Sequence, residues 1–152
     1  MTLSGKIVIV TGASRGIGAK SAKEFAKEGA TVVLVAQDKK SLTQVANEIG
    51  SQARVHALNI AKFEQVEKMI SDTLNEFGKI DIVINNAGKI SPIKRVMDIQ
   101  IDDWDQVIDV NLKGVFYGFK LALPSMLENG GGTFVTLSSG AAHNPLEAWS
   151  HY

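Results

Sequence analysis

Residues 7–18 of the 152-residue chain read IVIVTGASRGIG, and they carry the clearest indication of its fold. Its first four residues are apolar and β-branched with no polar residue between them, which is typical of a strand buried on both faces of a parallel sheet. Apolar residues then recur at helical spacing from Ile17 to Ala26, and Gly29 is a natural helix end. The stretch therefore predicts a strand, a glycine-rich turn and a helix in direct succession.

The rest of the chain repeats this alternation of short apolar runs and amphipathic stretches. Further strands are expected at residues 31–35, 54–58, 80–84 and 133–137. Helices are expected at residues 41–49, from 63 to near 78, and over a long segment from 102 to 127, where Pro124 would kink or end the last turns. Strands separated by helices in this way predict an α/β fold with a doubly wound parallel sheet and helices on both faces. No linker or repeat interrupts the pattern, so residues 1–152 are expected to form a single domain, with its binding crevice at the carboxyl ends of the strands.

The composition excludes several classes of protein. Lys plus Arg and Asp plus Glu both number 16, so no surplus of positive charge attracts nucleic acid or an anionic membrane. The absence of cysteine excludes disulfides and thiolate zinc sites, and it fits a reducing compartment. No uncharged apolar run approaches the roughly 18 residues that cross a bilayer, and the three histidines have no metal-binding spacing. A cytoplasmic globular domain without a metal site is therefore expected.

The glycine-rich turn is expected to bind a nucleotide. Glycines let the backbone approach a diphosphate closely, and the helix that follows begins with unpaired N–H groups at the positive end of its dipole. The spacing of Gly12, Gly16 and Gly18 differs from the GxGxxG fingerprint, and Ala19 separates Gly18 from Lys20, which excludes a P-loop. A plain strand-to-helix turn is the alternative, but the strand before it and the helix after it favour a nucleotide.

The kind of nucleotide depends on the end of the second strand, where an acidic side chain would bind a ribose 2′-hydroxyl and repel a 2′-phosphate. The neutral Gln37 stands there, and Asp38 follows one residue later. Arg15 in the turn either pairs with a phosphate or is a solvated surface charge. These residues predict NADP as the cofactor, with NAD as the alternative.

Several motifs, in this order and at these spacings, resemble the classical short-chain dehydrogenase/reductase family. They are TGASRGIG at residues 11–18, NNAG at 85–88, Asn111 in the long helix, Ser138-Ser139 after the last strand, and Tyr152. Each residue alone has an ordinary structural explanation, but together these explanations would require independent coincidences of spacing. The resemblance covers the whole chain. It implies a Rossmann-type fold and an oxidoreductase that moves a hydride between NAD or NADP and a carbonyl or alcohol.

The resemblance also implies roles for individual residues. Tyr152 would be the general acid, Ser139 would hydrogen-bond the substrate oxygen from 13 residues earlier, and Asn111 would hold the water of a proton relay. The cofactor would be bound by Gly12, Ser14, Arg15, Gly16, Ile17, Gly18, Gln37, Asn59, Ile60, Asn86, Ala87 and Gly88. Many members have an Asp at the position of Asn59, where it contacts adenine, so this contact would be altered or taken over by the Ile60 backbone.

The chain departs from the family pattern at its end. Members carry a Lys four residues after the Tyr, on the same helix face, where it favours the phenolate and holds the nicotinamide ribose. Tyr152 is the last residue, so that Lys and the carboxyl-terminal strands are absent from this sequence. We expect the chain to be part of a longer reductase. The alternative is a truncated nucleotide-binding module with little or no reductase activity.

The resemblance implies a small carbonyl or alcohol as substrate. Pro145 and Trp149 fall where sepiapterin reductase and related benzil-type diketone reductases carry similar residues, which favours a ketone or a vicinal dicarbonyl. Members commonly form dimers or tetramers through the long helix and the helix that follows the Tyr. A homo-oligomer is therefore expected, with neither nucleic acid nor a membrane as a partner.

Overall fold

A parallel sheet of five strands lies at the centre of the structure, a computed structural model that describes residues 2–144 and 146–152. The strands are β1 (Ile7–Thr11), β2 (Thr31–Ala36), β3 (Ala53–Ala57), β4 (Ile82–Asn85) and β5 (Thr133–Thr136), in the spatial order β3-β2-β1-β4-β5. The helices are α1 (Gly16–Lys27), α2 (Lys39–Ile49), α3 (Phe63–Phe77), α4 (Ile101–Ile108) and α5 (Gly114–Glu128). The predicted α/β fold with its parallel sheet is confirmed.

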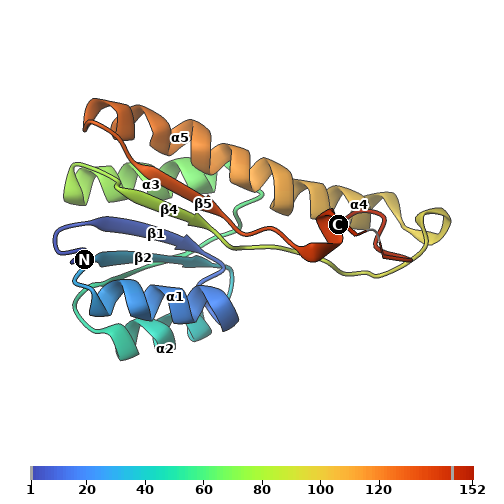
Figure 1. Cartoon of the computed structure of the whole chain (residues 1–152), viewed down its shortest axis with the longest axis horizontal. Coiled ribbons are helices and arrows are strands. Elements are labelled where there is room, and N and C mark those ends of the chain that lie inside the picture. The colour runs from blue at the N-terminus through green and yellow to red at the C-terminus, as the bar shows by residue number, and fades with distance from the viewer. Residues whose placement is uncertain (1, 145) are drawn as a thin grey trace.

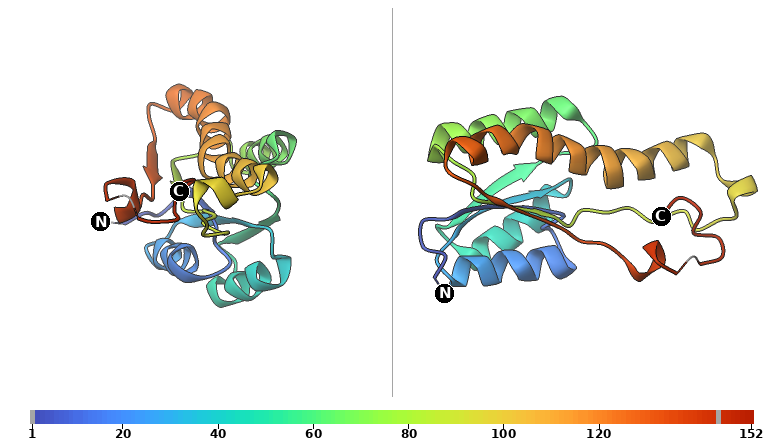
Figure 2. Two further views of the ribbon diagram at one scale, coloured as in Figure 1. Left: turned by 90° about the vertical axis from the view of Figure 1, so that its right-hand side faces the viewer. Right: turned by 45° about the horizontal axis from the view of Figure 1, so that its top comes forward.

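Helices cover both faces of the sheet, with α1 and α2 on one face and α3 and α5 on the other (Figure 1 and Figure 2). Successive strand residues point to opposite faces. In β1, Val8 and Val10 therefore join the apolar cluster with α1 and α2, whereas Ile7 and Ile9 join the cluster with α3 and α5. Burial on both faces explains why this strand is a continuous apolar run rather than an alternating one.

The order of the strands reverses at β1. From β1 the chain crosses to β2 and β3 on one side, and it returns to β4 and β5 on the other side. The connections that leave β1 and β4 therefore diverge, and a crevice opens at their carboxyl ends, which is where ligands bind in open α/β sheets. Both the glycine turn and the NNAG segment, residues 85–88, lie at this crevice.

The long helix expected from 102 to 127 is divided in the structure. A π-helical turn, Asp109–Lys113, joins α4 to α5, and it changes the hydrogen-bond spacing in the middle of the segment. Pro124 does not end α5, which continues to Glu128. Within the described residues, no helix is both long enough and apolar enough to cross a membrane.

Strand β4 begins two residues later than the apolar pattern predicts, because Asp81 anchors its start instead of extending it. The Asp81 carboxylate accepts hydrogen bonds from the Lys6 ammonium at 2.8 Å and from the Ile7 N–H at 2.9 Å. A charged group with these partners holds the amino ends of β1 and β4 together.

The segment from Leu146 to Tyr152 folds back against the loop that precedes α4. Glu147 pairs with Arg95 at 3.0 Å, and Trp149 forms a β-bridge with Lys94. Tyr152 does not lie on a helix, contrary to the expectation from the family pattern. Its N–H donates to the Trp149 carbonyl at 3.2 Å in a turn.

Candidate active site

The three glycines of the turn differ in what surrounds them. Gly12 has a φ of +66°, and a Cβ there would meet the Asn86 side chain at 2.7 Å. A Cβ on Gly18 would meet the Gly12 carbonyl oxygen at 2.4 Å. Gly16 has a φ of +57°, but a Cβ there would meet no protein atom within 4 Å. The first and third glycines therefore allow close packing of the turn, and Gly16 faces open space at the start of α1, where a diphosphate fits.

The NNAG segment is tied directly to the glycine turn. The Thr11 hydroxyl accepts hydrogen bonds from the N–H groups of Asn86 and Ala87, both at 3.0 Å. The Asn86 amide nitrogen donates to the carbonyls of Thr11 at 2.9 Å and Gly12 at 3.2 Å. The Asn86 side chain and the backbone N–H groups of Asn86 and Ala87 therefore hold the turn and the NNAG segment together.

A cavity of about 690 Å³, called here the nucleotide cavity, opens beside the turn and the end of β2. The predicted cofactor residues that line it are Gly12, Ser14, Arg15, Gly16, Ile17, Gln37, Ile60, Asn86, Ala87 and Gly88. Gly18 is packed behind the turn, and Asn59 is not among the lining residues. The Asn59 side chain instead accepts the Ala61 N–H at 3.0 Å in its own loop. The structure thus brings most of the predicted set around one space large enough for a dinucleotide's adenosine half.

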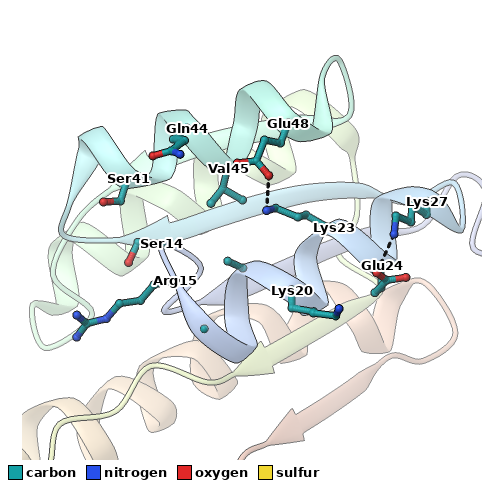
Figure 3. Close-up of a pocket in the computed structure, with 12 residues that line it drawn as sticks. Ser14, Arg15, Lys20, Lys23, Glu24, Lys27, Ser41, Gln44, Val45 and Glu48 are labelled. Atoms are coloured by element: carbon teal, nitrogen blue, oxygen red, sulfur yellow. Dashed lines mark hydrogen bonds and ion pairs between the residues drawn. The ribbon is translucent and has the colours of Figure 1, made fainter.

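A basic groove of about 470 Å³ adjoins this cavity between α1 and α2 (Figure 3). Ser14, Arg15, Gly16 and Ser41 line both spaces. Lys23 pairs with Glu48 and Lys27 pairs with Glu24. Among the described residues, Arg15 and Lys20 form no ion pair, so the groove carries an excess of positive charge next to the nucleotide cavity.

Asp38, the acidic residue nearest the end of β2, is engaged in capping α2. Its carboxylate accepts the Ser41 N–H at 3.1 Å and the Ser41 hydroxyl at 2.5 Å. The Ser41 hydroxyl hydrogen bond is the largest cause that lowers the pKa of Asp38 below its ordinary value, and the Ser41 N–H adds to it. Both carboxylate oxygens therefore already have protein donors.

A second cavity, of about 450 Å³, lies at the carboxyl ends of β4 and β5 and is called here the catalytic cavity. Asn111, Ser139 and Tyr152 all line it, although they come from the π-helical turn, the segment after β5 and the last turn of the chain. Residues 86–88 and Ile17 line both cavities. A dinucleotide that passes from one cavity to the other would therefore bring its far end to the three predicted catalytic residues.

Local hydrogen bonds set the orientation of these groups. The Ser139 oxygen accepts the Ala141 N–H at 3.2 Å, which leaves its hydroxyl proton available to a substrate oxygen. Asn111 donates to the Lys89 carbonyl and accepts the Lys89 N–H, both at 2.8 Å. Its side chain therefore fixes the loop after β4. The ring of Tyr152 packs edge to face with that of Trp149 at 5.6 Å between centroids.

Sequence reasoning missed three features of this region. Lys89 lines both cavities, and its place directly after NNAG was the available indication. The Asn85 amide donates to the Thr136 hydroxyl at 3.2 Å at the wall of the catalytic cavity. His151 is buried against the Trp104 ring, at 6.2 Å between centroids, a contact that the sequence did not indicate. Pro145, part of the basis for the substrate prediction, lies outside the described residues.

Comparisons with known proteins agree with this arrangement. An uncharacterized oxidoreductase from Staphylococcus aureus (strain MRSA252) is 42% identical over 138 residues, which are 90% of this chain and 59% of that protein. The structure of a 3-ketoacyl-(acyl-carrier-protein) reductase from Brucella melitensis, complexed with NADH, superimposes with a TM-score of 0.95 at 34% identity, over 99% of this chain and 64% of that one. The structure of a metagenomic short-chain oxidoreductase in complex with NADP gives a TM-score of 0.96 at 34% identity, over 100% of this chain and 70% of that one.

The chain spans less than two thirds of the length of the curated relatives it matches, at 59% and 64% of two staphylococcal proteins. These relatives do not distinguish a sepiapterin reductase branch, which stays a prediction. The family model described as short chain dehydrogenase matches residues 6–152, which include the glycine turn, NNAG, Ser139 and Tyr152. The chain therefore belongs to the short-chain dehydrogenase family.

Proposed function

We propose that the protein containing this chain reduces a small ketone or dicarbonyl with NADPH, or oxidises the corresponding secondary alcohol. The observation that carries this proposal is the pair of adjoining cavities. One surrounds the glycine turn, and the other gathers Asn111, Ser139 and Tyr152. The open space at Gly16, beside the N–H groups that begin α1, fits the diphosphate of a dinucleotide.

The bound cofactor supplies a hydride, and the chain's own residues manage the oxygen and the proton. Ser139 donates a hydrogen bond to the substrate oxygen and steadies the negative charge that develops there. Tyr152 transfers its phenolic proton to the same oxygen as general acid. Asn111 holds the Lys89 backbone and so shapes the wall that the substrate faces. Its role in a water relay is part of the proposal.

Replacement of Tyr152 with Phe tests this assignment. The variant should lose nearly all carbonyl reduction, because the aromatic ring remains but the transferable proton does not. The affinity for NADPH should stay within about twofold of that of the unmodified protein, because the lost hydroxyl acts in the chemical step rather than in cofactor binding. Tyr117→Phe is the matched control, because Tyr117 of α5 packs against Phe63 of α3 and lines neither cavity. Undiminished turnover by the Tyr152 variant would overturn the assignment.

We also propose that NADPH is preferred to NADH. The 2′-phosphate would bind where Ser14, Arg15 and Ser41 line both the nucleotide cavity and the basic groove (Figure 3). The hydrogen bonds between Asp38 and Ser41 support this preference, because the carboxylate is occupied by helix capping rather than directed to a ribose hydroxyl.

Arg15→Gln separates the two cofactors. Hydrogen bonds to a charged group contribute about 1.5–3 kcal/mol, so NADPH affinity should fall roughly tenfold or more while NADH affinity stays nearly constant. Nicotinamide fluorescence titrations measure both dissociation constants. Lys20→Gln is the control, because Lys20 lines the basic groove but not the nucleotide cavity. An equal loss for both cofactors, or a native preference for NADH, would contradict this proposal.

The same proposal includes a cytoplasmic homo-oligomer. The cysteine-free composition supports a reducing compartment. Exposed apolar side chains on α5 and the π-helical turn support contact with a second copy.

A further inference from the structure

The catalytic cavity has an unusual charge distribution. Of the residues that line it, Lys89 alone carries a charged side chain within the described part of the chain. Its other polar groups are neutral amides and hydroxyls, such as those of Asn85, Thr136 and Ser139. No described carboxylate forms an ion pair with Lys89. The cavity therefore presents one positive charge without a compensating negative one.

The position of this charge is well defined. The Asn111 side chain accepts a hydrogen bond from the Lys89 N–H and donates one to the Lys89 carbonyl, both at 2.8 Å. The Lys89 side chain is half-buried, and its ammonium donates a hydrogen bond to the Gln106 side-chain oxygen on α4. An ammonium has three N–H donors. Gln106 accepts from one of them, so the others remain available to a ligand.

The placement of α4 bears on which ligand these donors serve. A dinucleotide diphosphate is expected at the start of α1, where Gly16 leaves open space. Helix α4 lies on the arm that extends beyond the carboxyl ends of the strands, well away from α1 (Figure 1). Gln106 holds the ammonium on α4. Because Lys89 also lines the nucleotide cavity, assignment of an anion at Lys89 to the substrate requires that NADPH affinity be independent of Lys89.

We propose that Lys89 is a substrate-specificity residue, and that it selects carbonyl compounds that carry a carboxylate next to the reacting carbonyl, as 2-oxo acids do. This inference rests on the proposed reductase function and narrows its substrate class. A 2-oxo acid is itself a vicinal dicarbonyl, so the carboxylate and the ketone occupy neighbouring positions. The ketone oxygen faces Ser139 and Tyr152 while the carboxylate pairs with Lys89. The methyl ester of the same acid is larger by one methyl group and lacks the charge.

Benzoylformate and methyl benzoylformate form a matched pair for the test. In the unmodified protein with NADPH, kcat/KM should be higher for the acid. Lys89→Gln should lower kcat/KM for the acid about tenfold or more, chiefly through KM, because a charge-assisted hydrogen bond is lost. The value for the ester should change less than about threefold. Lys89→Arg should restore part of the preference, because it restores the charge.

Lys94→Gln is the control in the same loop, since Lys94 is exposed and lines neither cavity. Lys94→Gln should leave kcat/KM unchanged for both the acid and the ester. Equal effects of Lys89→Gln on acid and ester, or no effect on either, would overturn the specificity role while the reductase function stands. A tenfold loss of NADPH affinity in Lys89→Gln would also overturn it, because the charge would then serve the cofactor.

A binding measurement keeps the inference testable without turnover. Trp149 packs against Tyr152 at the catalytic cavity, so tryptophan fluorescence should report ligand binding there. Benzoylformate added to the protein saturated with NADP⁺ should bind about tenfold more weakly to Lys89→Gln than to the unmodified protein. Failure of benzoylformate to bind the unmodified protein, or equal binding to both, would refute the role of Lys89 whether or not the protein reduces carbonyls.

Discussion

At the scale of single residues, the glycines of the turn show that one motif serves two physical purposes. Gly18 has no positive φ, and it is required because a Cβ there would meet the Gly12 carbonyl oxygen at 2.4 Å. Gly16 has a positive φ and open space in front of it. At Gly18 the constraint is steric and comes from the protein's own packing. At Gly16 it comes from the left-handed backbone conformation and from the space that a ligand would occupy.

Alanine at these two positions should therefore have different effects. Gly16→Ala should cost about 1–2 kcal/mol of unfolding free energy, which is the penalty for a left-handed conformation, and should weaken NADPH binding because the methyl group enters the ligand's space. Gly18→Ala should cost more, roughly 3 kcal/mol, because the Gly12 carbonyl must shift. Urea unfolding and NADPH titration of both variants measure this. Equal losses of stability would contradict the distinction.

At the scale of elements, Asp81 joins the amino ends of the two central strands. Burial raises the pKa of Asp81, but hydrogen bonds from Lys6, from the Ile7 N–H and from Lys79 outweigh it and lower the pKa below the ordinary 3.8. The side chain is only 13% exposed, so solvent screens these contacts weakly. The ionised carboxylate therefore stabilises the pairing of β1 with β4.

This shift predicts a stability that depends on pH. Because the folded pKa lies below the unfolded one, the stabilisation is fully present above about pH 4 and is lost as the pH falls through the folded pKa. Asp81→Asn should lower the unfolding free energy at pH 7 by roughly 1.5–3 kcal/mol. The difference between the two proteins should shrink as the pH is lowered below 3.8. A difference that is constant with pH would show that ionisation of Asp81 is not the cause.

At the scale of the whole molecule, one helical face is left without a partner in the single chain. Exposed apolar residues recur along it at helical spacing, namely Leu112, Phe116, Leu123 and Leu127. An exposed apolar stripe of this kind commonly marks a contact surface. A second copy of the chain would bury the stripe against its own, because a two-fold interface uses the same surface on both partners.

Sedimentation or light scattering should find at least twice the 16.3 kDa mass of the chain. Phe116→Glu should shift the protein toward the monomer, because the interface would then bury an unpaired charge. Asn47→Glu on α2 is the control, since Asn47 is an exposed residue on the opposite face of the sheet. A monomeric native chain, or dissociation by both variants alike, would contradict the proposed assembly.

The pattern of apolar residues along the chain was sufficient to predict the parallel sheet and most helix boundaries. A strand buried on both faces, such as β1, must be apolar throughout, and helices must carry apolar residues at a period of 3.6. The π-helical turn at Asp109–Lys113 was beyond this reasoning, because the segment carries apolar residues on more than one face and so shows no break in its helical pattern. The late start of β4 could not be predicted from the pattern either, because it depends on contacts between Asp81 and the distant Lys6 and Ile7.

Local residue types and spacings were sufficient to identify the family, the succession of strands and helices, and the candidate turn and catalytic motifs, because none of these requires contacts between distant segments. Which residues share a cavity emerged only in the folded chain. The tertiary structure placed Asn111, Ser139 and Tyr152 around one space, turned Asn59 away from the nucleotide cavity and brought Lys89 to the wall of both. The physical reason is that a cavity is formed by segments distant in sequence, and its charge depends on which side chains the packed sheet and helices leave facing it.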